Sequence, residues 1–472
     1  MSFSRTSHGI ALITAAIAAS SIACSPRSID DDNSFPDGSD PDSPFALDTG
    51  TDPAFDGLAD GPKPPCTGLQ CQQVDCPGGT ETTVSGTVYA PNGTMPLYNV
   101  IVYVPNDTVA PFTKGVSCDK CGSLASGSPI VTALTDSKGN FNLQKVPVGT
   151  NIPLVIQLGK WRRQIVIPEV KKCETTKLTD KNQTRLPKKQ SEGDMPRIAV
   201  TTGGCDQLSC MLPKVGIDPS EFGVKGSSAA VHFYSAGGAG GPPGMTDAKT
   251  LWSDLTNLKN YDLAVFSCEC YEAPTTKDAT SFKTVTDYLS QGGRIFTTDF
   301  QYTWYKFSPD PALQGIGVIP GGAPSGDNPV KLDTSFPKGK ALADWMKNIE
   351  PSINYGDVKC DYVFNNLKST DKTKTQTWAS SDSTTFSGEA GPGIHPRFVT
   401  VNTPVGKPVE AQCGKAVHLD AHINQTDRVD ASYPAACKSP INPGEEAFAF
   451  FFFDLSSCIQ KEGEAPKPPP VK

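Results

Sequence analysis

Residues 261–266 read YDLAVF and residues 288–296 read YLSQGGRIF. Each contains a short apolar run typical of a β-strand, at residues 263–266 and 294–297. Between the runs, residues 280–289 place Phe282, Val285 and Leu289 on one face of a helix. This alternation of strand and helix predicts a parallel sheet with helices on both faces.

The same alternation of strand-like and helical segments continues on both sides of this stretch. Further strand-like runs occupy residues 198–200, 231–234 and 416–419, and residues 247–258 read as a second amphipathic helix. The last element begins Asn442-Pro443-Gly444-Glu445-Glu446, which combines a helix cap, a proline at the first helical position and early acidic residues. It continues to Leu455 through four consecutive phenylalanines and predicts a helix buried on all sides. We therefore expect an α/β domain over residues 196–460.

A different pattern precedes this domain. Residues 84–88 and 100–104 alternate between apolar and more polar positions, as half-buried strands do. Residues 135–141 read as strand, tight turn and strand, with Gly139 free to take a positive φ. Residues 152–156 and 164–167 predict a hairpin around Gly159 and Lys160. We expect a small β-domain over residues 78–175, a linker over 176–195 and a disordered tail over 461–472.

The amino-terminal end predicts export. Residues 10–23 are nearly all small or apolar, a length that suits a signal peptide and is too short for a membrane span. The run ends Ser21-Ile22-Ala23-Cys24, which resembles a bacterial lipobox and implies cleavage after residue 23 and lipidation of Cys24; an ordinary secretory signal is the alternative. Residues 24–77 predict a disordered acidic tether, and Ser25 favours the outer membrane or cell surface.

Composition supports export and limits the partners. The net charge of −8 argues against nucleic acid as a partner, because phosphate neutralisation needs a basic surface. Of 15 cysteines, assigning Cys24 to a lipid leaves 14, enough for seven disulfides in an oxidising compartment. Cys118 and Cys121 could instead form half of a zinc site or a labile redox pair.

Two family resemblances rest on ordered motifs. Val84-Ser-Gly86-Thr-Val88, the stretch from Thr135 to Leu143 and Val146-Pro147-x-Gly149 resemble the carboxypeptidase regulatory-like domain. That resemblance implies a non-catalytic, transthyretin-like or carbohydrate-binding-like β-sandwich. Residues 261–266 and 288–296, followed by Gly414-Lys415-Ala416-Val417 and the last helix, resemble the ThuA-like branch of the class I glutamine amidotransferase-like superfamily. It implies a flavodoxin-like α/β fold with a mostly parallel sheet. The whole arrangement resembles uncharacterised lipoproteins of myxobacterial type.

The sharpest polar constellation is His418-Leu419-Asp420-Ala421-His422. On a strand, residues 418, 420 and 422 share one face, where two imidazoles and a carboxylate could bind a metal. Asp299 follows the next strand and could add a fourth group at the carboxyl edge of the sheet. These four residues are the candidate catalytic or metal-binding groups.

Two other residues invite a functional interpretation. Cys268 follows the strand at 263–266, where amidotransferases carry a nucleophile, but Phe266 and Cys270 occupy the positions of the expected glycines. A disulfide partner is the simpler interpretation of Cys268 in an exported chain. Trp161 could stack on a sugar or cover the edge of the β-domain.

We expect a multidomain envelope lipoprotein with a non-catalytic binding or structural role and no cofactor. Its partners would be the membrane, through the lipid, and carbohydrate or an envelope protein. The alternative is an envelope hydrolase or carbohydrate-active enzyme that uses the candidate groups Asp299, His418, Asp420 and His422.

Overall fold

The computed structural model describes residues 65–121, 123–237, 239–321, 328–383, 388–424 and 426–471. The predicted signal peptide, Cys24 and most of the predicted tether lie outside these residues. Pro65–Lys472 forms one compact unit. None of its described helices has the length and hydropathy needed to cross a membrane.

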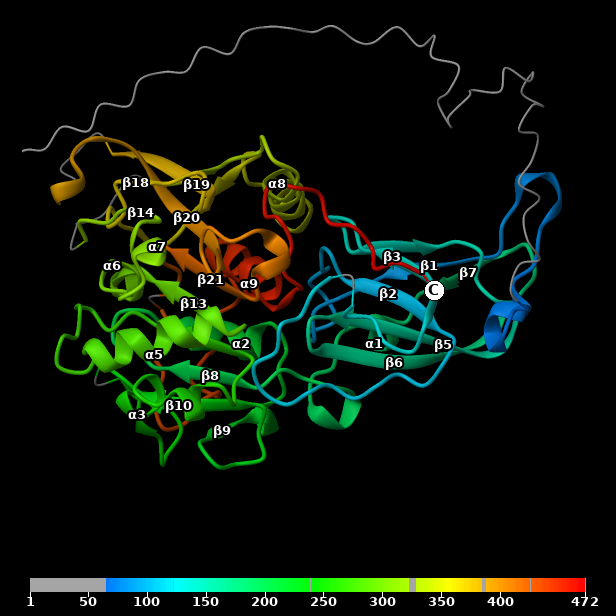
Figure 1. Cartoon of the computed structure of the whole chain (residues 1–472), viewed down its shortest axis with the longest axis horizontal. Helices are drawn as coiled ribbons and strands as arrows, with labels where there is room; N and C mark the ends of the chain where they lie inside the picture. The colour runs from blue at the N-terminus through cyan, green and yellow to red at the C-terminus, as the bar shows by residue number, and fades with distance from the viewer. Residues whose placement is uncertain are drawn as a thin grey trace, which may run out of the picture. The chain divides into compact units, whose positions relative to one another are not determined.

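The first part of this unit contains two sheets (Figure 1). A three-stranded sheet has the order β4 (Asn140–Leu143), β1 (Thr83–Thr87), β7 (Thr175–Leu178). A four-stranded sheet has the order β3 (Pro129–Leu134), β2 (Ile101–Pro105), β5 (Gly149–Leu158), β6 (Trp161–Val170). The predicted hairpin is confirmed, since β5 and β6 pair antiparallel around Gly159, and Gly139 has the predicted positive φ of 75°.

A third, larger sheet contains the strands predicted at residues 263–266 and 294–297. Its order is β11 (Thr246–Asp247), β10 (Val231–Ser235), β8 (Ile198–Thr201), β12 (Leu263–Phe266), β13 (Arg294–Thr298), β21 (Gly414–Leu419), β20 (Gly393–Thr403), β19 (Gln376–Ser383), β15 (Val330–Leu332), β16 (Asp357–Val358), with β9 (Phe222–Val224) beside β10. The strands from β10 to β21 run parallel, and the pairs from β21·β20 onward are antiparallel.

Two apolar clusters lie on the two faces of this sheet. Ile198 and Val200 of β8 belong to the cluster that contains α9 (Pro443–Ser456), whereas Ala199 belongs to the cluster that contains α5 (Ala279–Ser290). The cluster with α9 also includes residues of α8 (Pro337–Ile349). Because neighbouring strand residues point to opposite faces, the sheet is covered on both sides, as predicted.

The helix predicted over residues 247–258 is two helices instead. α3 (Lys249–Trp252) ends before Ser253, and α4 (Leu255–Leu258) begins after Asp254. The side chain of Asp254 accepts hydrogen bonds from the backbone N–H groups of Thr256 and Asn257 and so caps a new helix. The helical periodicity was correct, but the capping residue divides it.

The remaining elements are short. They are α1 (Lys181–Thr184), α2 (Met211–Lys214), α6 (Thr303–Lys306), α7 (Pro311–Gln314), β14 (Gly317–Val318), β17 (Tyr362–Val363), β18 (Ser369–Thr370), β22 (Ala421–His422) and the 3₁₀ turns at Gly68–Gln72, Pro77–Gly79, Gln190–Glu192, Leu208–Cys210, Pro219–Glu221, Asp299–Tyr302, Gly388–Ala390 and Val409–Ala411. β7 and α1 thus occupy part of the segment predicted as a linker.

The predicted buried helix is confirmed as α9. Asn442 and Glu445 form a reciprocal capping box at its start. Trp161, with 0% of its surface exposed, packs against Phe452 and Phe453 at centroid distances of 5.8 and 5.4 Å. Trp161 therefore belongs to the core, and the sugar-stacking interpretation is wrong.

The carboxyl-terminal segment packs against the protein instead of forming the predicted disordered tail. The Glu462 carboxylate lies 3.2 Å from Lys338 Nζ and 2.9 Å from Lys415 Nζ. The Thr132 hydroxyl of β3 donates to the Pro469 carbonyl at 2.9 Å. Figure 1 shows this segment in red running toward β3. The ion pairs of Glu462 and the hydrogen bond to Pro469 hold this segment against the protein.

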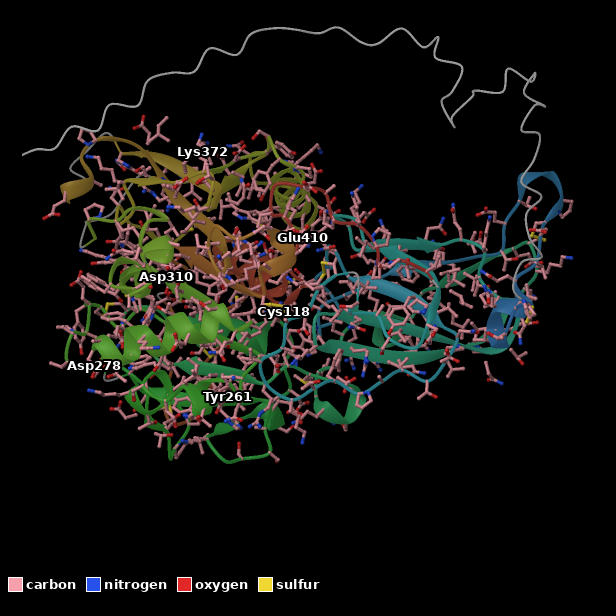
Figure 2. The ribbon with its side chains drawn as sticks, viewed as in Figure 1. Cys118, Tyr261, Asp278, Asp310, Lys372 and Glu410 are labelled. Atoms are coloured by element: carbon pink, nitrogen blue, oxygen red, sulfur yellow. A yellow bond between two sulfur atoms is a disulfide. The ribbon has the colours of Figure 1, made fainter. Side chains whose placement is uncertain are left out.

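Six disulfides connect twelve of the fourteen described cysteines. They are Cys66–Cys71, Cys76–Cys173, Cys118–Cys413, Cys121–Cys458, Cys205–Cys270 and Cys210–Cys437. Cys118, labelled in Figure 2, and Cys121 each pair with a distant cysteine, so neither the zinc nor the redox interpretation of that pair holds. Cys268 and Cys360 are buried free thiols.

Candidate functional site

The candidate site lies where the parallel strands of the large sheet end. β8, β12, β13 and β21 are adjacent and parallel, so the residues that follow them meet at one edge. β10 and β12 lie on opposite sides of β8, so the chain crosses from one side of β8 to the other between β10 and β12. Ligands bind at the carboxyl edge of open α/β sheets where the strand order reverses in this way.

Three different donor atoms converge at this edge. The Cys268 thiol donates to Asp299 Oδ2 at 3.1 Å, and His422 Nε2 lies 3.1 Å from the same oxygen. One sulfur, one oxygen and one nitrogen atom of these residues all lie within 4.8 Å of one another. The residues are 0%, 2% and 5% exposed, respectively. A thiol, a carboxylate and an imidazole are the ligand types of zinc sites in proteins.

The chain holds Asp299 in an unusual conformation. Its φ is +40°, a region that non-glycine residues rarely adopt and that costs about 1–3 kcal/mol. Asn366 Nδ2 donates to the other carboxylate oxygen of Asp299 at 2.7 Å. Gln301 Nε2 donates to the Ser267 carbonyl at 2.6 Å and so connects the loop after β13 to the loop after β12. These contacts fix Asp299 beside Cys268.

Burial keeps the Cys268 thiol protonated. Burial, and then the negative charge of Asp299, raise the pKa of Cys268 well above its usual value. Burial acts to lower the pKa of His422, but the contact with the Asp299 carboxylate and the charge of Asp206 outweigh it, and the pKa is raised. Both shifts act in the direction that favours the protonated form of the group.

Asp206 is a further buried carboxylate near this group. It is 1% exposed, and neither of its carboxylate oxygens accepts a well-formed hydrogen bond. Burial raises its pKa to about 6, while the neighbouring His422 acts to lower it. Asp206 comes from the loop after β8. One small region is therefore surrounded by residues that follow three parallel strands, β8, β12 and β13, and by His422 of β22.

The other two predicted site residues lie beside this group and are not part of the three-residue cluster. β21 ends at Leu419, so residues 418, 420 and 422 do not lie on one continuous strand, but His418 Nε2 lies 3.9 Å from Asp420 Oδ1. His418 Nδ1 lies 3.1 Å from the Thr297 hydroxyl. Asp420 accepts hydrogen bonds from the backbone N–H and the side-chain Nδ2 of Asn366, at 2.8 and 2.7 Å. Asp420 therefore positions Asn366, which in turn binds Asp299.

A disulfide and a glycine hold the loop that carries Cys268. Cys205–Cys270 joins the loops after β8 and β12, and Cys270 has a φ of +73°. A Cβ atom on Gly203 would lie 2.2 Å from the Cys268 carbonyl oxygen, so only glycine fits there. The prediction that Cys268 is a disulfide partner is wrong, because Cys270, two residues later, takes that role.

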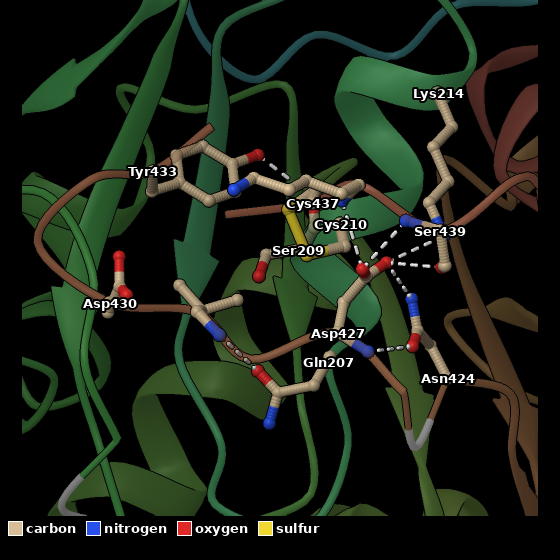
Figure 3. The surroundings of a disulfide bond; sticks show 12 residues. Gln207, Ser209, Cys210, Lys214, Asn424, Asp427, Asp430, Tyr433, Cys437 and Ser439 are labelled. Atoms are coloured by element: carbon tan, nitrogen blue, oxygen red, sulfur yellow. Dashed lines mark hydrogen bonds and ion pairs between the residues drawn. A yellow bond between two sulfur atoms is a disulfide. The ribbon is translucent and has the colours of Figure 1, made fainter. Parts of the chain in front are cut away.

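The loop that follows His422 is held by charge and by a disulfide (Figure 3). Asp427 lies 2.9 Å from Lys214 Nζ and accepts from Asn424 Nδ2 at 2.8 Å and from the Ser439 hydroxyl at 2.6 Å. These hydrogen bonds outweigh burial and hold the pKa of Asp427 well below its usual value. Cys210–Cys437 closes the same region. His422 is thereby anchored on its carboxyl-terminal side.

The geometry favours a metal site over a thiol nucleophile. A nucleophilic cysteine needs a thiolate beside a base, often a histidine. Here the thiol donates to Asp299, and its raised pKa opposes ionisation. A bound cation would reverse that preference, because coordination deprotonates a thiol.

No family model and no curated protein matches the chain. Among solved structures, a ThuA-like protein from Bacteroides uniformis matches with 11% identity over 57% of this chain and 95% of its own, at a TM-score of 0.29. Two chains of type II cohesin–X–dockerin complexes from Acetivibrio cellulolyticus match over 32% of this chain, at 16% and 17% identity and TM-scores of 0.15 and 0.17. They cover 79% and 95% of their own chains. All three are distant likenesses.

Proposed function

We propose that this chain is an exported, lipid-anchored envelope protein that binds a divalent transition metal, zinc above all, through Cys268, Asp299 and His422. The observation that carries the proposal is the convergence of three different donor atoms within 4.8 Å. Zinc bond lengths place the ligand atoms of a tetrahedral site about 3.4–3.6 Å apart. The two contacts of 3.1 Å need only a few tenths of an ångström of expansion.

A bound metal would also protect the Cys268 thiol from oxidation. Twelve described cysteines form six disulfides, whereas Cys268 remains a thiol two residues from the bonded Cys270. A thiolate bound to zinc is protected by coordination. Because the three ligands are almost fully buried, the site supports a binding or structural role in preference to turnover of a substrate. The predicted envelope hydrolase is the less favoured alternative.

The proposed domains are a transthyretin-like β-sandwich followed by a flavodoxin-like α/β domain. Two small sheets that contribute to one apolar cluster support the first assignment. The parallel strands support the second, because their spatial order β10-β8-β12-β13-β21 is the order 2-1-3-4-5 of flavodoxin-like folds.

Matched cysteine variants test the metal site. After removal of metal with a chelator, the wild-type chain is expected to take up one zinc ion per molecule. Cys268→Ser should weaken zinc binding at least tenfold, measured by competition with a chromophoric chelator. Cys360→Ser removes the second free thiol of the described residues and should leave zinc affinity unchanged. Absence of zinc uptake by the wild type, or an equal loss in both variants, would contradict the proposal.

The anchor has its own test. The proposed localisation at the outer membrane or cell surface follows from the lipobox-like sequence at Cys24, and the six disulfides are in keeping with an oxidising compartment. Cys24→Ala should move the protein from the membrane fraction to the soluble fraction of the cell envelope. Unchanged fractionation of this variant would refute the lipid anchor.

A further inference from the structure

A cleft of about 480 Å³ lies apart from the metal site. Its walls come from the loop at residues 111–115, from the segment before β8 and from the loop before β10. We call it the basic cleft, defined by Phe112, Lys114, Lys160, Gln190, Arg197 and Ser228. Its volume falls within the range of small-molecule sites, about 300–1,000 Å³.

The carboxylates in this cleft are already paired. Asp262 Oδ1 lies 2.7 Å from Lys160 Nζ, and Asp262 Oδ2 accepts from the Arg197 backbone N–H at 2.7 Å. Asp194 lies 2.8 Å from Arg162 Nη2. Each acidic group in the lining thus has a cation that neutralises it.

Two cations in the lining have no such partner. Neither Lys114 nor the Arg197 guanidinium forms an ion pair with a carboxylate of the described residues. The Arg197 guanidinium carbon lies 5.7 Å from the Tyr261 ring centroid, and Figure 2 labels that tyrosine. Burial, and then the charge of Arg197, lower the pKa of His232. The cleft is therefore locally positive in a chain of net charge −8.

The walls of the cleft are fixed before any ligand binds. Lys160 Nζ donates to the Thr113 carbonyl at 2.9 Å, which holds the 111–115 loop. The Arg162 guanidinium carbon lies 4.0 Å from the centroid of the Phe112 ring. Gln190 Nε2 donates to the Ser228 carbonyl at 2.9 Å and joins the other two walls. A preformed cavity binds more tightly because less ordering is needed on binding.

We propose that the basic cleft binds a small organic anion carrying a carboxylate or a phosphate group, held by Arg197 and Lys114. Arg197 supplies the planar, bidentate donor that matches either oxyanion, and Lys114 supplies a second positive charge at the rim. The hydroxyl and amide groups of the lining could form hydrogen bonds with the uncharged polar part of such a ligand. This site is independent of the metal site and of its ligands.

Calorimetry with three matched probes tests the cleft. D-glucuronate and glucose 6-phosphate carry the two candidate anionic groups, and D-glucose is their neutral counterpart. We expect saturable binding of at least one anion at millimolar concentration or below, and no binding of glucose. The preferred anion distinguishes a carboxylate from a phosphate ligand. Binding of glucose with equal affinity, or binding of neither anion, would overturn the proposal.

Variants assign the binding to the cleft. Arg197→Gln should weaken binding of the preferred anion at least tenfold. Lys114→Gln changes an exposed loop side chain that the fold does not need, and should weaken binding severalfold. Lys171→Gln, at the far end of β6 from Lys160, is the charge-matched control and should change nothing. Equal affinity in the wild type, Arg197→Gln and Lys114→Gln proteins would overturn the assignment.

Discussion

Asp299 contacts three neighbours at once: the Cys268 thiol, the His422 imidazole and the Asn366 amide. Its position after a parallel strand could be predicted from the sequence, and so could its place at the carboxyl edge. Its partner Asn366 could not, because it comes from residues 305–395, for which the resemblance to ThuA-like proteins offers no counterpart. The sequence does not predict Cys268 as a metal ligand, because it does not reveal which of Cys268 and Cys270 forms the disulfide with Cys205.

Glu446 gives a pH-dependent prediction. It is 8% exposed, its Oε2 has no hydrogen-bond partner, and burial, followed by the charges of Glu350 and Glu445, raises its pKa to about 7. A carboxyl whose pKa is higher in the folded state than in the unfolded chain binds more protons when folded. It therefore makes the free energy of unfolding decrease as pH rises from about 4.5 to about 7.

Glu446→Gln should remove this decrease. Compared with the wild type, the variant should show a higher urea midpoint at pH 8 and a smaller difference at pH 5. Urea unfolding followed by tryptophan fluorescence at both pH values checks this. Glu410→Gln, on the surface, is the control. A Glu446→Gln midpoint that follows the wild type at both pH values would refute the shifted pKa.

The helix α9 joins the two parts of the compact unit. Its phenylalanines contact residues of the large sheet on one side and Trp161 and Tyr98 of the first part on the other. Gly159 makes this approach possible, because a Cβ there would lie 1.8 Å from the Ser456 carbonyl oxygen. The sequence predicted the helix and its cap, but not the partner for its second face.

Removing the Trp161 ring should strongly destabilise the protein. Trp161→Ala leaves a cavity between β6 and α9 and should cost about 3–5 kcal/mol in the free energy of unfolding. Val166→Ala on the same strand changes a side chain that is 54% exposed and should cost below about 1 kcal/mol. Chemical denaturation of the two variants checks the contrast. Similar losses in both would mean that Trp161 is not part of the shared core.

Two disulfides join the first part of the unit to the second over long sequence separations, 295 residues for Cys118–Cys413 and 337 for Cys121–Cys458. Because a cross-link restricts the unfolded chain more when its loop is longer, these bonds should contribute more than the Cys66–Cys71 bond, whose separation is 5.

The double variant Cys118→Ala/Cys413→Ala should lower the free energy of unfolding by roughly 4 kcal/mol, and Cys66→Ala/Cys71→Ala by about 2 kcal/mol or less. Denaturation midpoints without reductant measure both. A larger loss from the short loop than from the long one would contradict this account of the fold.

The parts of the large sheet differ in how far sequence predicts them. The sequence predicts the parallel strands β10, β8, β12, β13 and β21, because each is a short apolar run between turn or helix signals, but it does not predict the short parallel strands β9 and β11. The antiparallel extension is not predicted, because β19 is mostly polar in sequence and β20 contains Pro396 and a buried Arg397, which donates to polar partners such as the Ser381 hydroxyl. The disulfide pairing was also beyond prediction, because spacing does not fix which distant cysteines meet.

The most direct test of the central claim is anomalous diffraction from crystals of the full chain grown with zinc, measured on both sides of the zinc absorption edge. We predict one peak bonded to Cys268 Sγ, a carboxylate oxygen of Asp299 and a ring nitrogen of His422, at about 2.0–2.3 Å from each atom. A map without an anomalous peak among these three residues, in which Cys268 Sγ still lies at hydrogen-bond distance from Asp299, would contradict the account.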